Sequence, residues 1–258
     1  MNNTIKEYLV TLLDKGVRLD NRKLDEYRKP ITIEINVSKS AEGSARVRIG
    51  DTEVIAGVKL DVGEPFSDSP DKGVLIVGAE LLALSSPEFQ LGPPDAQTTE
   101  LARVVDRGIR NSKMIDMNKL CIREGELVWT VFLDIYTIND SGNLLDASAL
   151  AAVVALKNCV FPKLENDKVK YGEHTKEKLP TTKIPITCTL GKMKNFIIID
   201  PGLEEERFLD SRLTITIGEN QHIHAMQKGG EESLKGEDID EMIKIAMHAN
   251  KELRKLIP

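Results

Sequence analysis

Hydrophobic and polar positions along the chain alternate in two groups of predicted strands, and each group is followed by a predicted helix. In the first half, Ile31 to Val37 alternates residue by residue, and two further alternating runs flank Gly50-Asp51, which predicts a hairpin. Leu127 to Ile138 carries the strongest strand pattern of the chain. Asp146 to Cys159 follows as a predicted helix of small residues that is suited to close packing against a sheet.

A similar order of elements begins again in the last third of the chain. Further strands are predicted at 184–190, 196–200, 213–217 and 221–227, and a helix from about Gly236 to the end. The lysine-rich stretch from Lys163 to Lys183 shows little periodicity, which is typical of an exposed linker or a long loop. We therefore expect an α+β protein with a pseudo-duplicated core. Its parts are an N-terminal helix and first unit in 1–165, a connector in 166–183 and a second unit in 184–258.

Composition and charge narrow the classes of protein to which this chain can belong. Its 258 residues are 41% hydrophobic and 29% charged, as in a soluble globular protein. We find no export signal and no apolar run long enough to span a bilayer, and the three cysteines form no CxxC pair, so we expect a cytoplasmic protein with no membrane partner. The net charge of −6 argues against free, non-specific binding to nucleic acid.

Against this acidic background, the segment from Glu100 to Arg110 carries a local basic stripe. At 100° per residue, Arg103, Arg107 and Arg110 lie opposite the apolar positions of a predicted helix. Arg103 and Arg107 are one turn apart, roughly 6 Å along the axis, so that two guanidinium groups could reach neighbouring phosphates of one strand. The stripe predicts an anion site, with nucleic acid as the leading ligand.

A solvated helix face is the alternative interpretation of this stripe. Asp106 precedes Arg110 by four residues and Glu100 precedes Arg103 by three, so both arginines could form ordinary helix ion pairs. Arg107 has no carboxylate at either spacing. It must therefore bind water, a distant acid or a ligand.

Other candidate chemistry in the sequence is weaker. His222 and His224 would share one face of a strand, but no third ligand occurs at a recognisable spacing, so we expect neither a metal site nor a cofactor. None of the common nucleophile or nucleotide-binding motifs is present. Asp200 ends a very apolar strand, and the acids 204–206 follow it, which fits either general acid chemistry or a solvated acidic loop.

Several segments, taken in order, resemble RNase PH-like proteins. The run ELARVVDR at 100–107 is the most specific, and it resembles the non-catalytic RNase PH-like ring subunit of the archaeal exosome. The likeness extends over nearly the whole chain. The other segments are GVRLDNR at 16–22, GSA at 43–45, GDTEVIA at 50–56, VGEPF at 62–66 and GVLIV at 73–77.

The resemblance implies an RNase PH-like fold, with two similar αβ units whose mixed sheets pack against helices. It also implies a hexameric ring of three copies each of this chain and a catalytic RNase PH-like partner, joined by RNA-binding cap proteins. In such a ring the partner degrades RNA from the 3′ end by phosphorolysis. Arg103 and Arg107, with Arg110 as a further candidate, would hold the RNA backbone.

Departures from active relatives favour a non-catalytic role. Active relatives carry a Gly-Ser-Arg-like phosphate turn before the small-residue helix, whereas the turn here reads Gly142-Asn143-Leu144. They also carry two aspartates six residues apart, where this chain has Asp200 and Glu206. Two alternatives stay open: a self-sufficient phosphorolytic 3′-to-5′ exoribonuclease that uses these two acids, and an unrelated α+β interaction module.

Overall fold

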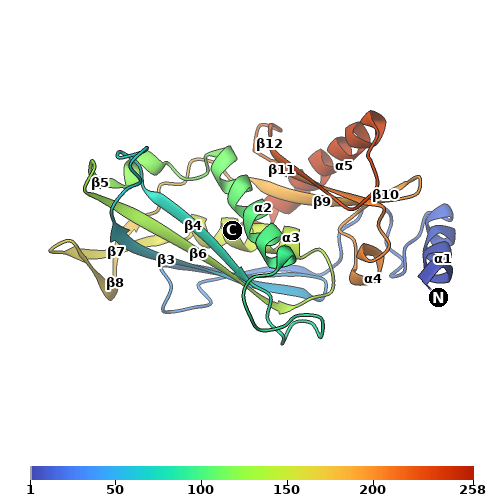
Figure 1. Ribbon diagram of the computed structural model, residues 1–258, viewed down its shortest axis with the longest axis horizontal. Coiled ribbons are helices and arrows are strands. Elements are labelled where there is room, and N and C mark those ends of the chain that lie inside the picture. The colour runs from blue at the N-terminus through green and yellow to red at the C-terminus, as the bar shows by residue number, and fades with distance from the viewer. Residues whose placement is uncertain (1) are drawn as a thin grey trace.

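The computed structural model describes residues 2–258, which form two large sheets, a separate two-stranded sheet, and helices packed on and between the large sheets (Figure 1). The first part of the chain forms the larger sheet and the central helices. Its elements are α1 (Asn2–Asp14), β1 (Ile31–Ile35), β2 (Gly43–Ile49), β3 (Thr52–Gly63), β4 (Val74–Glu80), α2 (Ala96–Ser112), the 3-10 turn η1 (Met117–Leu120), β5 (Cys121–Arg123), β6 (Leu127–Asn139) and α3 (Leu144–Lys157).

The second part of the chain adds a hairpin and a smaller sheet that α5 covers. Its elements are β7 (Val160–Glu165), β8 (Lys168–Lys178), β9 (Ile186–Met193), β10 (Phe196–Ile199), the short helix α4 (Leu203–Glu206), β11 (Ser211–Ile217), β12 (Ile223–Gly229) and α5 (Gly236–Lys255). The hairpin predicted at Gly50-Asp51 is confirmed, with Ile49 paired to Thr52 across it.

The larger sheet has the strand order β1-β2-β3-β6-β4, with β5 paired to β6. This sheet is mixed, because β4 runs parallel to β6 while the other pairs are antiparallel. Along β3 every second side chain is buried, as expected for a strand with one face against helices. The smaller sheet has the order β10-β9-β11-β12 and is antiparallel throughout.

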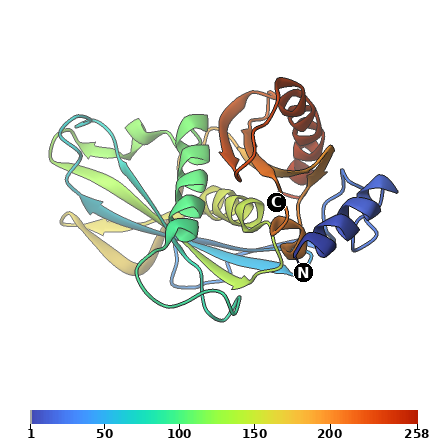
Figure 2. The same ribbon diagram turned by 45° about the vertical axis from the view of Figure 1, so that its right-hand side comes forward.

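Helix α3 lies between the two sheets and joins them into one core (Figure 2). It packs on β2 and β3 of the larger sheet and on β9 of the smaller one. Thirteen of its residues, from Leu144 to Leu156, are buried. A helix that is covered on all sides needs small apolar side chains so that both sheets can approach it, which explains its alanine-rich sequence.

The stretch expected to be a linker or a long loop forms a β-hairpin instead. Strands β7 and β8 pair antiparallel around Asn166 and Asp167, which adopt φ angles of 50° and 60°, as two-residue hairpin turns require. One ion pair across the hairpin joins Lys163 of β7 to Glu173 of β8 at 2.8 Å, and Lys170, also in β8, pairs with the same Glu173 at 2.9 Å. Because the polar residues lie on a solvated two-stranded ribbon, they lack the hydrophobic alternation that marks a strand in a sequence.

Candidate functional site

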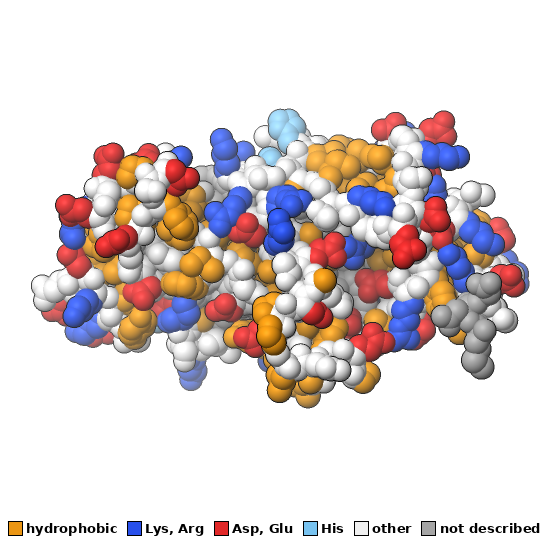
Figure 3. All heavy atoms as spheres, in the orientation of Figure 1, with side chains coloured by type: hydrophobic (Ala, Val, Ile, Leu, Met, Phe, Trp, Pro, Cys, Tyr) orange, Lys and Arg blue, Asp and Glu red, His pale blue; other side chains and the backbone are white. Residues whose placement is uncertain are grey.

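Helix α2 presents its arginines on the face opposite to the one that it buries. Asp95 caps the helix, because its side chain accepts a hydrogen bond from the backbone N–H of Thr98 at 2.8 Å. On the buried face, Gly108 packs so closely on β11 that an added Cβ would lie 3.1 Å from Oγ1 of Thr216. The predicted apolar face is confirmed, and Figure 3 shows Lys and Arg side chains gathered over α2. The buried apolar residues of this helix are Leu101, Val104, Val105 and Ile109.

Arg110 is held by its own helix and by a neighbouring strand. Its Nε donates to the two carboxylate oxygens of Asp106 at 2.7 and 2.9 Å, so the predicted ion pair is confirmed. Its Nη2 donates to the backbone carbonyl of Leu75 in β4. Because part of its hydrogen-bonding capacity and charge is used within the chain, Arg110 is the least available of the three arginines.

Arg107 and Arg103 have no carboxylate partner among residues 2–258. Nη1 of Arg107 donates to Oε1 of Gln227 in β12 at 2.7 Å, and this acceptor is neutral. Arg103 is exposed. The ion pair that the spacing of Glu100 and Arg103 allows is not formed, because Oε1 of Glu100 accepts from Nη2 of Arg212 at 2.6 Å. Strand β11 thus brings a competing guanidinium to the helix.

A surface hollow of about 600 Å³ lies at these two arginines. Helix α2 contributes Arg103 and Arg107 to its lining, and β12 contributes Gln227. Both guanidinium groups keep their full charge and unused N–H donors, which suit the oxygens of a phosphate. The hollow can therefore bind an anion without the chain supplying any group that reacts with it.

The turn that leads into α3 is the second place where the sequence predicted chemistry. Asn143 caps α3 with a φ of 52°, and its backbone N–H donates to Oε1 of Glu206 at 2.8 Å. Beside it, Gly142 has a φ of 97°, and an added Cβ would lie 2.4 Å from the backbone nitrogen of Leu203. A carboxyl group of the chain itself therefore occupies the N-terminal end of α3, where backbone N–H groups favour anions.

Asp200 is enclosed by partners that neutralise its charge. Nε and Nη2 of Arg28 donate to its two carboxylate oxygens at 3.0 and 2.8 Å, and Nδ2 of Asn143 and Nη1 of Arg22 donate at 2.8 and 3.1 Å. Burial raises the pKa of Asp200, but the hydrogen bonds and the charge of Arg28 outweigh it and hold this pKa below its ordinary value. With 0% of its side chain exposed, Asp200 is a structural anion.

Two neighbouring carboxyl groups have pKa values shifted in the opposite direction. Burial raises the pKa of Glu206 to about 7, although the N–H of Asn143 acts to lower it. Burial also raises the pKa of Asp146 to about 6, although the hydroxyl of Tyr27 donates to this carboxylate at 2.6 Å. Both carboxyl groups therefore titrate closer to neutral pH than ordinary carboxyl groups do.

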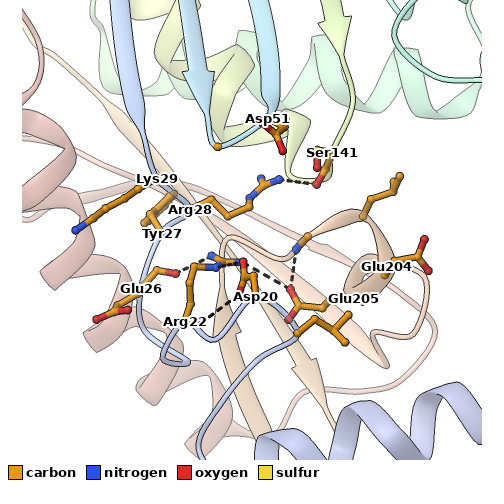
Figure 4. Close-up of a pocket in the computed structure, with 14 residues that line it drawn as sticks. Asp20, Arg22, Glu26, Tyr27, Arg28, Lys29, Asp51, Ser141, Glu204 and Glu205 are labelled. Atoms are coloured by element: carbon orange, nitrogen blue, oxygen red, sulfur yellow. Dashed lines mark hydrogen bonds and ion pairs between the residues drawn. The ribbon is translucent and has the colours of Figure 1, made fainter.

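A hollow of about 680 Å³ lies next to this cluster (Figure 4). The arginines around it are engaged within the chain: Nη1 of Arg28 donates to the backbone carbonyl of Ser141, and Arg22 pairs with Asp20. Arg18 lies deeper and forms a buried ion pair with Glu205. Arg18 and Arg22, from the segment at 16–22, thus hold the smaller sheet and the N-terminal segment together.

The two histidines that the sequence singled out lie at the smaller sheet. His224 is in β12, and His222 lies just before this strand. Within the described residues, they form no group with a third histidine, cysteine or acid that could hold a metal ion. The backbone carbonyl of His224 accepts a hydrogen bond from Nδ2 of Asn111 at 3.3 Å, so β12 contacts α2 at this point as well.

The sequence did not predict the residues that complete the arginine hollow at α2 or the cluster around Asp200. Gln227 and Arg212 reach α2 from positions more than 100 residues away, and Arg28 reaches Asp200 across 172 positions. No local spacing marks such contacts. One clue exists, because Arg107 lacked a carboxylate within its own helix and therefore required a distant partner.

Comparison with protein families assigns both parts of the chain to one family. Residues 27–162 match domain 1 of the 3′ exoribonuclease family, RNase PH, and residues 183–249 match domain 2 of this family. The resemblance inferred from the motifs is therefore confirmed for both parts.

Individual relatives are similar over nearly the full length. The protein named exosome complex component Rrp42 from Thermococcus kodakarensis is 43% identical, over 100% of this chain and 95% of its own length. The protein of this name from Archaeoglobus fulgidus is 45% identical over 96% and 94%. Among solved structures, a chain of the Archaeoglobus fulgidus exosome with RNA bound to the active site matches with a TM-score of 0.90 and 44% identity, over 98% of this chain and 97% of that one.

Proposed function

Because the chain belongs to the 3′ exoribonuclease family of RNase PH, we propose that it is a non-catalytic ring subunit of an exosome. In this role it scaffolds the ring and positions single-stranded RNA for 3′-to-5′ phosphorolysis by a catalytic RNase PH-like partner. The full-length similarity to proteins named as exosome components supports this proposal. The ring contains three copies of each subunit and carries RNA-binding cap proteins.

The pair Arg103 and Arg107 is the observation that carries the RNA-positioning role. Both lie on one face of α2 beside a hollow of about 600 Å³, and neither has a carboxylate partner among residues 2–258. Arginine binds phosphate through several parallel N–H donors, so two such groups one helical turn apart can hold successive phosphates of a strand. Arg110, which is paired with Asp106, adds charge at the end of this stripe.

The non-catalytic assignment rests on the turn before α3. Leu144, where active relatives provide a phosphate-binding arginine, is buried and has no polar side chain. The carboxyl group of Glu206 occupies the end of α3 and would repel phosphate when it is ionised. Asp200 is buried and paired with Arg28, so it is not accessible to a substrate. These three features argue against the alternative of a self-sufficient phosphorolytic exoribonuclease.

The state of the cysteines supports a location for the proposed complex. Cys121, Cys159 and Cys188 are free thiols, the state that a reducing compartment maintains, and we assign the complex to the cytoplasm. A separate observation concerns membranes. None of the helices in residues 2–258 combines the length and the apolar character needed to cross a bilayer.

A charge-reversal variant tests the proposed function. We expect Arg103→Glu together with Arg107→Glu to leave assembly with the catalytic partner intact, as measured by size-exclusion chromatography. We expect the variant to slow phosphate-dependent RNA degradation by the assembled complex at least tenfold. The matched control reverses two exposed lysines of β8, Lys168→Glu and Lys176→Glu, and has the same net charge. Equal activity of both variants and the wild type would refute the RNA role.

A further inference from the structure

We propose that the β11–β12 edge of the smaller sheet prepares the arginine pair on α2 for RNA, through the positioning residues Gln227 and Arg212. This inference rests on the proposed RNA role of Arg103 and Arg107. Gln227 orients Arg107 without neutralising it, and Arg212 engages Glu100, a carboxylate at a spacing that would otherwise allow it to pair with Arg103. Neither residue needs to touch RNA to act in this way.

Gln227 is a suitable partner for a guanidinium that must stay available to a ligand. Its Oε1 accepts one N–H of Arg107 at 2.7 Å, which leaves the other donors of this guanidinium unused by Gln227. An amide carries no charge, so the pair remains fully cationic. A glutamate at this position would form a salt bridge and cancel the charge that attracts phosphate. The choice of an amide therefore fixes the geometry of Arg107 and preserves its charge.

Arg212 acts on the other arginine through Glu100. Glu100 lies three residues before Arg103, a spacing at which helical residues form ion pairs. Its carboxylate instead binds Nη2 of Arg212 at 2.6 Å, and Arg103 is left exposed. Gly229 makes room for this contact, because an added Cβ at that position would lie 2.7 Å from Nη2 of Arg212.

The strand register brings the two positioning residues to the same side of the smaller sheet. Arg212 pairs with Gly229, and Thr214 pairs with Gln227, in the antiparallel register of β11 and β12. Directly opposed residues, and residues two apart on one strand, point to the same face. Arg212 and Gln227 therefore share the face that contacts α2. The smaller sheet thereby sets the geometry of a site whose arginines belong to the other family domain.

The role of Gln227 is tested by the RNA affinity of the assembled complex. The affinity is measured without phosphate so that the RNA is not degraded. The probe is a 5′-labelled single-stranded oligoadenylate, and the readout is fluorescence anisotropy. Gln227→Met keeps the size of the side chain but removes the acceptor, and we expect about three- to tenfold weaker binding. The matched control is Gln97→Met, which removes an exposed amide from the same helix as the arginines.

A double-mutant cycle separates positioning from a direct or purely structural effect. If Gln227 acts through Arg107, adding Gln227→Met to Arg107→Ala produces no further loss. A loss of the same size in both backgrounds would overturn the positioning role, and so would wild-type affinity of Gln227→Met alone. Wild-type affinity of Arg107→Ala would instead refute the proposed RNA function itself. Gln227→Glu provides a second variant, and we expect it to bind RNA more weakly than Gln227→Met.

A rescue experiment tests Arg212. We expect Arg212→Met to weaken RNA binding about threefold, because Glu100 becomes free to pair with Arg103. Adding Glu100→Gln removes that carboxylate and should restore the affinity. If the double variant binds as weakly as Arg212→Met alone, Arg212 does not act through Glu100, and this part of the inference is wrong.

Discussion

The backbone N–H of Asn143 donates to the Glu206 side chain at 2.8 Å, so a carboxyl group of this chain lies at the N-terminal end of α3. The pair joins two residues that are 63 positions apart in the sequence. In our account this contact replaces the phosphate that active relatives bind before the corresponding helix. Under the proposed function, the chain keeps the elements of the family fold while its own carboxyl group fills the phosphate site.

The raised pKa of Glu206 predicts a specific pH dependence of stability. Its folded-state pKa of about 7 lies above the ordinary value of 4.5, so the folded chain holds this proton more tightly than the unfolded chain. The free energy of unfolding therefore falls as pH rises from about 4.5 to 7, by up to about 3 kcal/mol from this group. We expect Glu206→Gln, which mimics the protonated form, to remove this loss. Urea denaturation at pH 5 and pH 8 measures it.

The pKa of Asp146 is also raised, so this group changes the pH dependence of stability in the same direction as Glu206. Comparing Glu206→Gln with the wild type separates the two contributions, because Asp146 is present in both proteins. The stability difference between Glu206→Gln and the wild type should be small at pH 5 and grow toward pH 8. A difference that stays constant over this range would mean that Glu206 does not titrate as described.

Removal of Arg28 should strongly destabilise the fold. Arg28 donates to Asp200 and to the backbone carbonyl of Gly142. Its loss leaves the buried carboxylate of Asp200 with Arg22 as its one cationic partner among residues 2–258. We expect Arg28→Ala to lower the free energy of unfolding by about 3–5 kcal/mol. Denaturant titration checks this value.

An exposed arginine provides the control for that measurement. Arg48, whose side chain is 48% exposed, pairs with Glu53 on the surface, and Arg48→Ala should cost less than about 1 kcal/mol. Equal losses for the two variants would show that the buried Arg28–Asp200 contact contributes no more to stability than a surface ion pair.

Salt dependence of RNA binding provides a quantitative test of the arginine pair. Each phosphate contact on a single strand contributes about −0.7 to the slope of log K against log salt concentration. We expect Arg103→Ala with Arg107→Ala to make this slope shallower by about 1.4 in the assembled complex. The double variant Lys168→Ala and Lys176→Ala should retain the wild-type slope. An unchanged slope in the arginine variant would show that these side chains do not contact phosphates.

Local patterns in the sequence predicted the elements that position the candidate site. The apolar face of α2 and the pair of Asp106 with Arg110 follow from helical spacing, and both are present. The partner of Glu100 could not be predicted, because Arg212, which binds its carboxylate, lies in β11, 112 positions away in the sequence. Hairpin β7–β8 was missed for a different reason. Most of its residues are polar and exposed, and only a few, among them Phe161, Leu164 and Val169, pack against the core, so the sequence shows little hydrophobic alternation.

In the proposed function, this chain positions RNA and leaves the chemistry to a partner. Release of nucleoside diphosphate from a single-stranded RNA, in the presence of phosphate, tests it most directly. We predict no release by the chain alone and, after addition of a catalytic RNase PH-like partner, more release than the partner produces by itself. Phosphate-dependent release by the chain alone would contradict the account, because the turn filled by Glu206 would then have to bind phosphate.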